Sequence, residues 1–185
     1  MTEMDNRMTL AKSDAAAPRV KTTRQKKPIA SLAGKTWTGR EKVPKWLADG
    51  NGSQSIFSFA QSALVDQIVC VRKGLPSSYV AEMSEALAMT RTSFLDSLQL
   101  PRSTIEDRIK KNTPLTPSEG DAVLRAAKAL AKAEEVFEER AYASDWLKRE
   151  IRSLGGVTPV SLMDTDSGFA LVMNTLGRIE HGVVA

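Results

Sequence analysis

Cysteine and histidine are almost absent from this chain of 185 residues, which contains one of each, Cys70 and His181. A lone cysteine cannot form a disulfide within the chain or supply the thiolates of a multi-cysteine zinc site, so we expect a reducing compartment and no metal site. His181 lies close to the end of the sequence, which is a poor place to hold a rigid catalytic base. We therefore predict a protein that is not an enzyme, with no catalytic residues and no cofactor.

Long hydrophobic runs are missing as well. No apolar stretch approaches the roughly 18 residues that suggest a membrane span, and the first residues lack the apolar core of a signal peptide. Aromatic residues make up only 5% of the chain, so a modest core of smaller apolar side chains is expected. These absences predict a cytoplasmic protein with no membrane partner.

Positive charge is concentrated at the start of the chain. Residues 1–50 hold 11 Lys or Arg and 5 Asp or Glu, whereas the other 135 residues hold 15 and 17. Because this segment has little periodic apolar content, it cannot bury enough surface to offset the entropy of ordering. We predict a disordered basic arm over residues 1–52. Its cluster Arg24-Gln25-Lys26-Lys27 is interpreted either as a solvated tail or as a segment that follows DNA phosphates or a protein surface.

In the rest of the sequence, apolar residues recur with the spacing of helices, and apolar and polar residues hardly ever alternate with the period of two that is typical of strands. We therefore predict an all-α fold. Apolar residues recur at steps of three and four from Ile56 to Gly74, which predicts one helix there. Thr116-Pro117-Ser118-Glu119 is a strong helix start, with Thr as cap, Pro first in the helix and Glu completing a capping box. This helix is expected to run to about Phe137.

Shorter helices are predicted around this long one. One extends from Ala141 to Arg152, and another begins near Asp166, which is interpreted as its N-cap. A helix containing Phe94 is expected to be capped by Thr92-Ser93. The remaining helices are predicted to begin near Pro76, Arg102 and Pro159.

The segment from Phe94 to Ile105 has the layout of a helix-turn-helix: a short helix, a tight turn and a second helix with an exposed N-terminal edge. It resembles the Xre-type helix-turn-helix, in which Pro-Arg-Ser-Thr-Ile, here residues 101–105, is a familiar start of the second helix. We place the motif at about 92–111, within a helical domain over 53–133. Gln99 stands where that family often has glycine, so its Cβ must tolerate the bend.

The second helix of this motif carries the predicted DNA contacts. Arginine suits guanine, Ser and Thr suit several bases, and lysine anchors phosphate without reading sequence. Operator DNA is the expected partner, and a purely structural helical hairpin is the alternative. The predicted contact residues are Arg102, Ser103, Thr104, Asp107, Arg108, Lys110 and Lys111.

The last fifty residues carry the most specific pattern: Trp146-Leu147, then Leu154-Gly155-Gly156-Val157-Thr158-Pro159, Gly168, and a closing Leu176–Val183. This order and spacing resemble the toxin-binding domain of the Xre/MbcA/ParS antitoxin family, over about residues 77–185 with the helix-turn-helix included. The resemblance implies a small helical toxin-binding domain over 134–185. It also implies a partner toxin of the RES type, which resembles ADP-ribosyltransferases and uses or destroys NAD.

In that family the C-terminal end covers the active site of the toxin, so the resemblance points to the tail as the contact surface. The charged side chains of this end would pair with charged groups of the toxin, and its apolar side chains would supply most of the binding energy. Without the resemblance, Arg178 and Glu180 would be interpreted as a solvated helix end. The predicted toxin contacts are Arg178, Ile179, Glu180, His181, Gly182, Val183 and Val184.

Three functions fit these observations. The first, which we favour, is an antitoxin that binds a toxin and represses its own operon. The second is a stand-alone helix-turn-helix transcriptional regulator with a C-terminal dimerisation domain, and the third is an antitoxin whose helix-turn-helix no longer binds DNA. Because operators usually present two half-sites, we also expect a homodimer within a larger toxin–antitoxin complex.

Overall fold

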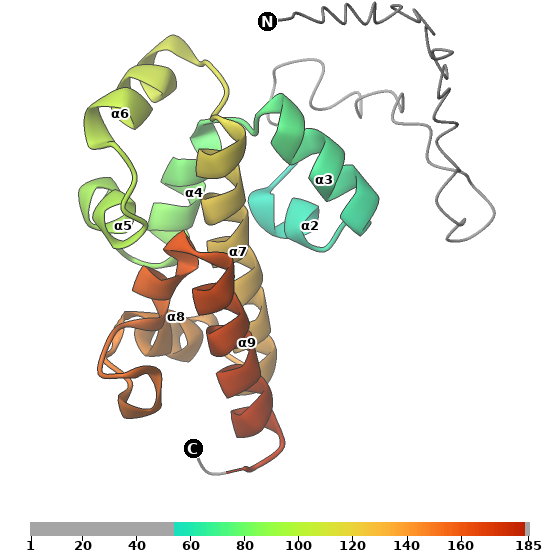
Figure 1. Ribbon diagram of the computed structural model, residues 1–185, viewed down its shortest axis with the longest axis vertical. Helices are drawn as coiled ribbons and strands as arrows, with labels where there is room; N and C mark the ends of the chain where they lie inside the picture. The colour runs from blue at the N-terminus through green and yellow to red at the C-terminus, as the bar shows by residue number, and fades with distance from the viewer. Residues whose placement is uncertain (1–53, 184–185) are drawn as a thin grey trace, which may run out of the picture. The chain divides into compact units, whose positions relative to one another are not determined.

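The computed structural model describes residues 54–183 of the chain, and these residues form an α-helical body (Figure 1). No strand occurs among them, and their one extended pairing is an isolated antiparallel bridge between Ile151 and Val157. The predicted all-α fold is confirmed. The arm predicted over residues 1–52 and the predicted contact Val184 lie outside the described residues.

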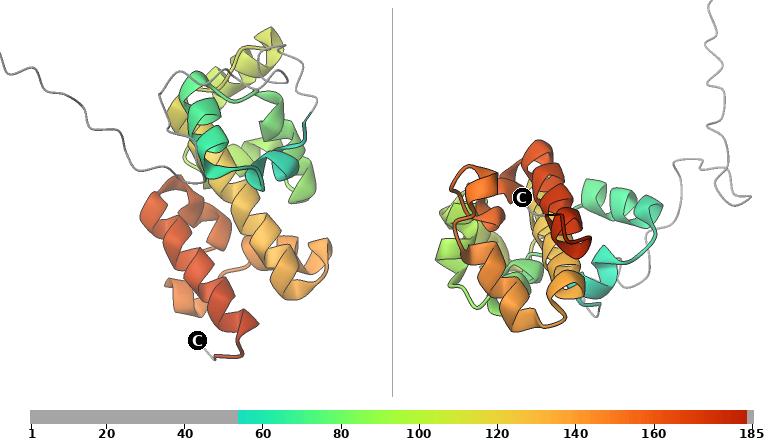
Figure 2. Two further views of the ribbon diagram at one scale, coloured as in Figure 1. Left: turned by 90° about the vertical axis from the view of Figure 1, so that its right-hand side faces the viewer. Right: turned by 90° about the horizontal axis from the view of Figure 1, so that it is seen from below.

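The long helix α7 (Pro117–Phe137) is the axis of this body, and helices from both ends of the described chain pack against it (Figures 1 and 2). Its predicted capping box is confirmed: the Thr116 N–H donates to Glu119 Oε2 at 2.7 Å, and Thr116 Oγ1 accepts from the Glu119 N–H at 3.4 Å. Five of its alanines are buried, and such small side chains let neighbouring helices approach closely.

Within the described residues, α7 is preceded by five shorter helices: α2 (Ile56–Ala60), α3 (Leu64–Lys73), α4 (Ser78–Ala86), α5 (Arg91–Ser97) and α6 (Arg102–Lys111). The prediction of one helix from Ile56 to Gly74 is therefore wrong, because the chain breaks between α2 and α3. Thr90 rather than Thr92-Ser93 caps α5, since Thr90 Oγ1 accepts from the Ser93 N–H at 3.1 Å.

A buried amide holds the break between α2 and α3. Gln67 Nε2 donates to the carbonyl oxygens of Ala60 and Ser62, both at 2.9 Å, and Ser62 Oγ donates to Phe59 O at 2.7 Å. These bonds satisfy carbonyls that a continuous helix would satisfy with its own backbone. The bend also lets Phe59 point into the core.

After α7 come α8 (Arg140–Lys148), the 3₁₀ turns η1 (Arg152–Leu154) and η2 (Pro159–Asp164), and α9 (Asp166–Glu180). The helix predicted to reach Arg152 ends at Lys148, because the chain becomes extended at Arg149 and the Ile151 N–H then donates to Val157 O at 3.1 Å. Asp166 is the first residue of α9 rather than its cap. Thr165 Oγ1 takes that role and accepts from the Gly168 N–H at 3.1 Å.

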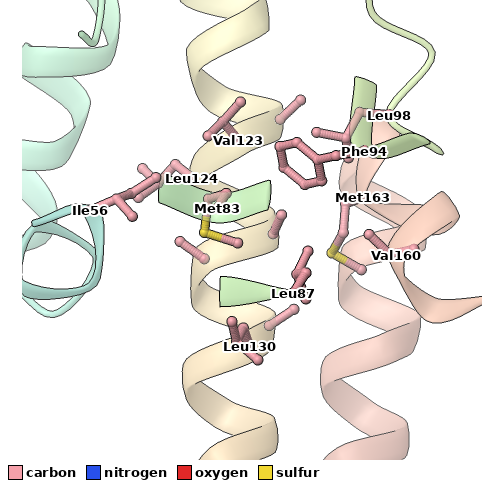
Figure 3. Packing of buried hydrophobic residues seen from close by; sticks show 14 of the residues in the cluster. Ile56, Met83, Leu87, Phe94, Leu98, Val123, Leu124, Leu130, Val160 and Met163 are labelled. Atoms are coloured by element: carbon pink, nitrogen blue, oxygen red, sulfur yellow. The ribbon is translucent and has the colours of Figure 1, made fainter. Parts of the chain in front are cut away.

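One hydrophobic core runs through all of these elements (Figure 3). Side chains from α4, α5, α7 and η2 meet in it, and the labelled members include Met83, Phe94, Val123 and Met163. The predicted boundary between 133 and 134 falls within α7. Helix α7 therefore belongs to the packing of both the first and the second half of the described chain.

Candidate functional site

Helices α5 and α6 form a helix-turn-helix held by buried apolar side chains. Phe94, Leu95 and Ile105 are fully buried. Gln99 adopts a left-handed conformation in the turn, with φ of 53°, so the expectation that a residue with a Cβ must tolerate this bend is confirmed. The Leu100 N–H donates to Leu95 O at 2.9 Å, which closes the turn and sets the direction of α6.

Most of the predicted DNA contacts lie on the open side of α6. Six of the seven have exposed side chains, and they extend from the first turn of the helix to its last residue. The exposed six are Arg102, Ser103, Thr104, Asp107, Lys110 and Lys111. The structure therefore brings these six residues together on the exposed surface of α6.

Arg108 is the exception, because its side chain is used within the fold. Its Nε lies 3.3 Å from Glu119 Oε2, and its Nη1 donates to Pro114 O at 3.1 Å. The Glu119 side chain is only 8% exposed and also closes the capping box of α7. Arg108 thus fastens the end of α6 to the start of α7, a role that sequence reasoning missed because no local pattern pairs these residues.

Carboxylates balance the cations around α6. Arg102 makes two hydrogen bonds to Asp96, Lys111 Nζ lies 3.9 Å from Asp107 Oδ2, and Arg91 Nη1 lies 3.7 Å from Glu106 Oε2. These pairs are largely solvent-exposed, and exposed pairs contribute little to stability. Phosphate groups can therefore replace the carboxylates at small cost.

The tail forms a capped helix end rather than an extended strand. The Val183 N–H donates to Arg178 O at 2.8 Å and the Gly182 N–H to Ile179 O at 3.0 Å, with Gly182 at φ of 66°. This is the Schellman arrangement that glycine favours. All predicted toxin contacts from Arg178 to Val183 are exposed, and the apolar Ile179 and Val183 are 37% and 53% exposed.

Glu180 is tied to the central helix. Lys132 Nζ donates to Glu180 Oε1 at 2.9 Å and to Glu135 Oε2 at 3.1 Å. The hydrogen bond from Lys132 lowers the pKa of the Glu180 carboxyl, and the same bond raises the pKa of Lys132. The end of α9 is therefore held against α7 by an ion pair between residues 48 positions apart.

Comparison with known proteins connects these two surfaces to a family. The model of the antitoxin Xre/MbcA/ParS C-terminal toxin-binding domain matches residues 132–182, and the model of the antitoxin Xre-like helix-turn-helix domain matches residues 67–128. The chain is 31% identical over 152 residues to the Prs ADP-ribosylating antitoxin of Sphingobium sp. (strain YBL2), covering 75% of this chain and 94% of that protein. This chain belongs to the Xre/MbcA/ParS antitoxin family.

Further relatives carry the same family name. The antitoxin Xre of Photorhabdus laumondii is 32% identical over 116 residues, covering 62% of this chain and 78% of the relative. The antitoxin Xre of Pseudomonas putida is 30% identical over 112 residues, covering 60% of this chain and 69% of the relative. The chain is thus an Xre-family antitoxin with a helix-turn-helix domain and a C-terminal toxin-binding domain.

In this antitoxin, Arg125 on α7 binds the backbone of η2. Its Nε donates to Met163 O at 2.8 Å, its Nη2 donates to Asp164 O at 2.9 Å, and the same guanidinium pairs with Asp121. Gln99 in the helix-turn-helix also reaches η2, where its Nε2 donates to Asp164 Oδ2 at 3.2 Å. Sequence reasoning missed the contacts with η2, because those partners lie 38 to 65 positions apart.

The described part of the antitoxin holds neither a metal-binding cluster nor a membrane-spanning helix. Within residues 54–183, no group of three or more His, Cys, Asp or Glu side chains is placed to bind a metal ion. In the same range, no helix combines the length and apolar character needed to cross a bilayer.

Proposed function

We propose that this antitoxin neutralises a RES-type, NAD-consuming toxin by covering its active site with the tail, residues 178–184. The observation that carries the proposal is the capped end of α9, which exposes Ile179 and Val183 beside charged side chains. Apolar anchors with a polar surround are the usual source of binding energy at protein interfaces. The toxin-binding domain model includes this helix end, and one relative is named an ADP-ribosylating antitoxin, which supports a toxin of that chemistry.

The charged side chains of the tail allow it to recognise charged groups of the toxin. An arginine such as Arg178 pairs with carboxylates in a two-pronged geometry, and Glu180 suits arginines that would otherwise hold the pyrophosphate of NAD. Because the Gly182 and Val183 N–H groups bond back to the last turn of α9, the helix end is ordered before the toxin arrives. Ordering beforehand reduces the entropy lost on binding. The antitoxin needs no catalytic group for this role.

The second part of the proposal is repression of its own operon through α6. This part is supported by the exposure of Arg102, Ser103 and Thr104 at the N-terminal edge of α6, since that edge of a recognition helix is the part that contacts base edges. Two copies would read two half-sites, so a homodimer within a larger toxin–antitoxin complex is part of the proposal. A repressor of its own operon acts at the bacterial chromosome, in the cytoplasm.

Growth and cellular NAD in bacteria that express the toxin test the neutralisation. The toxin gene is sought next to the antitoxin gene and is expressed alone, with the full antitoxin and with the Ile179→Asp variant. We expect the toxin alone to arrest growth and deplete NAD. The full antitoxin should restore both growth and NAD, and the Ile179→Asp variant should restore neither. Leu171→Asp is the control, because Leu171 is 45% exposed on the same helix but lies outside the tail.

The opposite result would favour a different function. If the full antitoxin does not rescue growth, the stand-alone regulator becomes the better interpretation. Operator binding by the Arg102→Ala variant separates the remaining possibilities. Lost binding with intact neutralisation supports a helix-turn-helix that reads DNA, whereas unchanged binding removes Arg102 from the contact surface.

A further inference from the structure

Helix α3 presents apolar side chains that the other described elements leave uncovered. Leu64, Val65 and Ile68 are 64%, 37% and 39% exposed. Leu64 and Ile68 lie one turn apart and therefore share a face of the helix. This face lies at the edge of the body, where α3 packs beside α7 (Figure 1). Adjacent exposed apolar side chains commonly mark a binding surface.

A groove of about 230 Å³ continues this face between α3 and α7. Ile68 lines it from α3, and Leu124 lines it from α7. Two cations, Arg72 and Lys128, also line it, together with Asp121. Because the face of an aromatic ring attracts positive charge, cations beside an apolar wall favour an aromatic occupant.

Gln67 also lines the groove, and its side-chain oxygen is an unpaired acceptor. The residue is only 4% exposed, and within residues 54–183 no group donates a hydrogen bond to its Oε1. The amide cannot exchange its oxygen and nitrogen, because Nε2 donates to the carbonyl oxygens of Ala60 and Ser62. A buried acceptor without a donor is destabilising. The occupant of the groove is therefore expected to bring an N–H or O–H group.

Trp46 of this chain has the chemistry that the groove requires. An indole is a large apolar ring, and its one polar group, the Nε1–H, donates a hydrogen bond and accepts none. Two further apolar residues, Val43 and Leu47, lie close to Trp46 in the sequence. The same short segment can therefore supply the ring, the donor and an apolar cover for α3.

The groove is within reach of Trp46. The carbonyl oxygen of Gln54 accepts a hydrogen bond from Tyr79 Oη at 3.0 Å, which fixes the start of the described chain. Only α2, a helix of five residues and about 8 Å, separates Gln54 from the Ala60 carbonyl that holds Gln67. Trp46 precedes Gln54 by eight residues, which span up to about 27 Å when extended.

We propose that residues 43–47 of this chain bind the apolar face of α3, with the Trp46 indole in the α3–α7 groove and its Nε1–H donating to Gln67 Oε1. Val43 and Leu47 cover the exposed side chains of α3. The contact gives the buried Gln67 oxygen its donor and shields apolar surface within one chain. It leaves α6 and the tail on α9 open.

Nuclear magnetic resonance of the full chain labelled with nitrogen-15 tests this contact. The three tryptophans give three indole N–H signals, and the one that disappears in Trp46→Phe belongs to Trp46. We expect this N–H to exchange with solvent about 10-fold or more slowly than a free indole. Nuclear Overhauser effects should join its ring to the methyl groups of Ile68 and Leu124. Exchange at the free rate without such effects would overturn the proposal.

An exposed position on α3 tests the groove without disturbing the core. Ile68→Asp should release the indole, so that its N–H exchanges at the free rate. Leu171→Asp is the matched control, because Leu171 is 45% exposed on α9, and it should leave the protection unchanged. Circular dichroism confirms that both variants are folded. Protection of the Trp46 N–H that persists in Ile68→Asp would place the indole elsewhere and overturn the proposal.

The proposed hydrogen bond has a readout of its own at Gln67. Trp46→Phe keeps an aromatic ring but removes the donor, so the carbon-13 signal of the Gln67 side-chain carbonyl should move upfield. Trp37→Phe, the same change at another tryptophan, should leave this signal in place. An unchanged Gln67 signal in Trp46→Phe would show that the indole does not bind this oxygen.

A mixture of differently labelled chains decides whose Trp46 fills the groove. The proposal expects the Overhauser effects from Trp46 to Ile68 and Leu124 within one chain. Effects that arise only between labelled and unlabelled chains would overturn it, because the groove would then bind the segment of another molecule.

Discussion

At the scale of single residues, Gly168 has the least room for a side chain among the glycines of the described residues. A Cβ at this position in the first turn of α9 would collide with the carbonyl oxygen of Leu162, whereas Gly177 later in the same helix has open space around it. We predict that Gly168→Ala lowers the free energy of unfolding by about 2–3 kcal/mol, because the backbone of η2 must shift. Gly177→Ala is the control and should stabilise by about 0.5–1 kcal/mol. Urea denaturation followed by circular dichroism measures both, and equal effects would contradict the close approach at Gly168.

The pair of Lys132 and Glu180 gives a second prediction at this scale, concerning pH. Its hydrogen bond lowers the pKa of Glu180 below the ordinary 4.5, so the pair stabilises the fold above that pH. This contribution is lost as the pH falls through the lowered pKa. Lys132→Met should return the pKa of Glu180 to its usual range, as followed by carbon-13 NMR of the carboxyl group. An unchanged titration would mean that Lys132 does not hold Glu180 in solution.

At the scale of elements, two residues near the end of α6 are expected to have different roles. Arg108 stabilises the junction between α6 and α7, whereas Lys110 contributes to DNA binding. Arg108→Ala leaves the buried Glu119 carboxylate without its cation, so we expect a loss of about 2 kcal/mol in the free energy of unfolding. Lys110→Ala should leave stability unchanged, since Lys110 is exposed, and should weaken operator binding while lowering the salt dependence by about one charge. Denaturation and operator titrations at several salt concentrations measure these effects. If the Arg108→Ala protein were as stable as the wild type but no longer bound the operator, the result would indicate that Arg108 contacts DNA directly.

At the scale of the whole molecule, Arg125 links the helix-turn-helix half to the toxin-binding half. Removing its side chain leaves the carbonyls of Met163 and Asp164 without their donor, so Arg125→Ala should destabilise the protein by about 2–3 kcal/mol. Because one core runs through residues 54–183, the variant should still unfold in a single calorimetric transition. Two separate transitions would show that the halves are independent domains in solution.

Much of the fold follows from local signals in the sequence. The capping box at Thr116, the turn at Gln99 and the extent of α6 depend on residues within a few positions of one another, and each was predicted correctly. The helix assumed from Ile56 to Gly74 failed for the opposite reason. Its apolar spacing continues across the break, and only the folded chain brings the Gln67 amide to the carbonyls of Ala60 and Ser62.

By itself, the sequence determined the helical fold class, the helix-turn-helix and membership of the antitoxin family, because caps, turns and family motifs are short-range patterns. Only the tertiary structure decided which charged residues face solvent. It assigned Arg108 to Glu119, Arg125 to the carbonyls of η2, and Lys132 to Glu180. These pairings join helices that are distant in the chain, and their geometry exists only once the apolar faces of those helices have packed together.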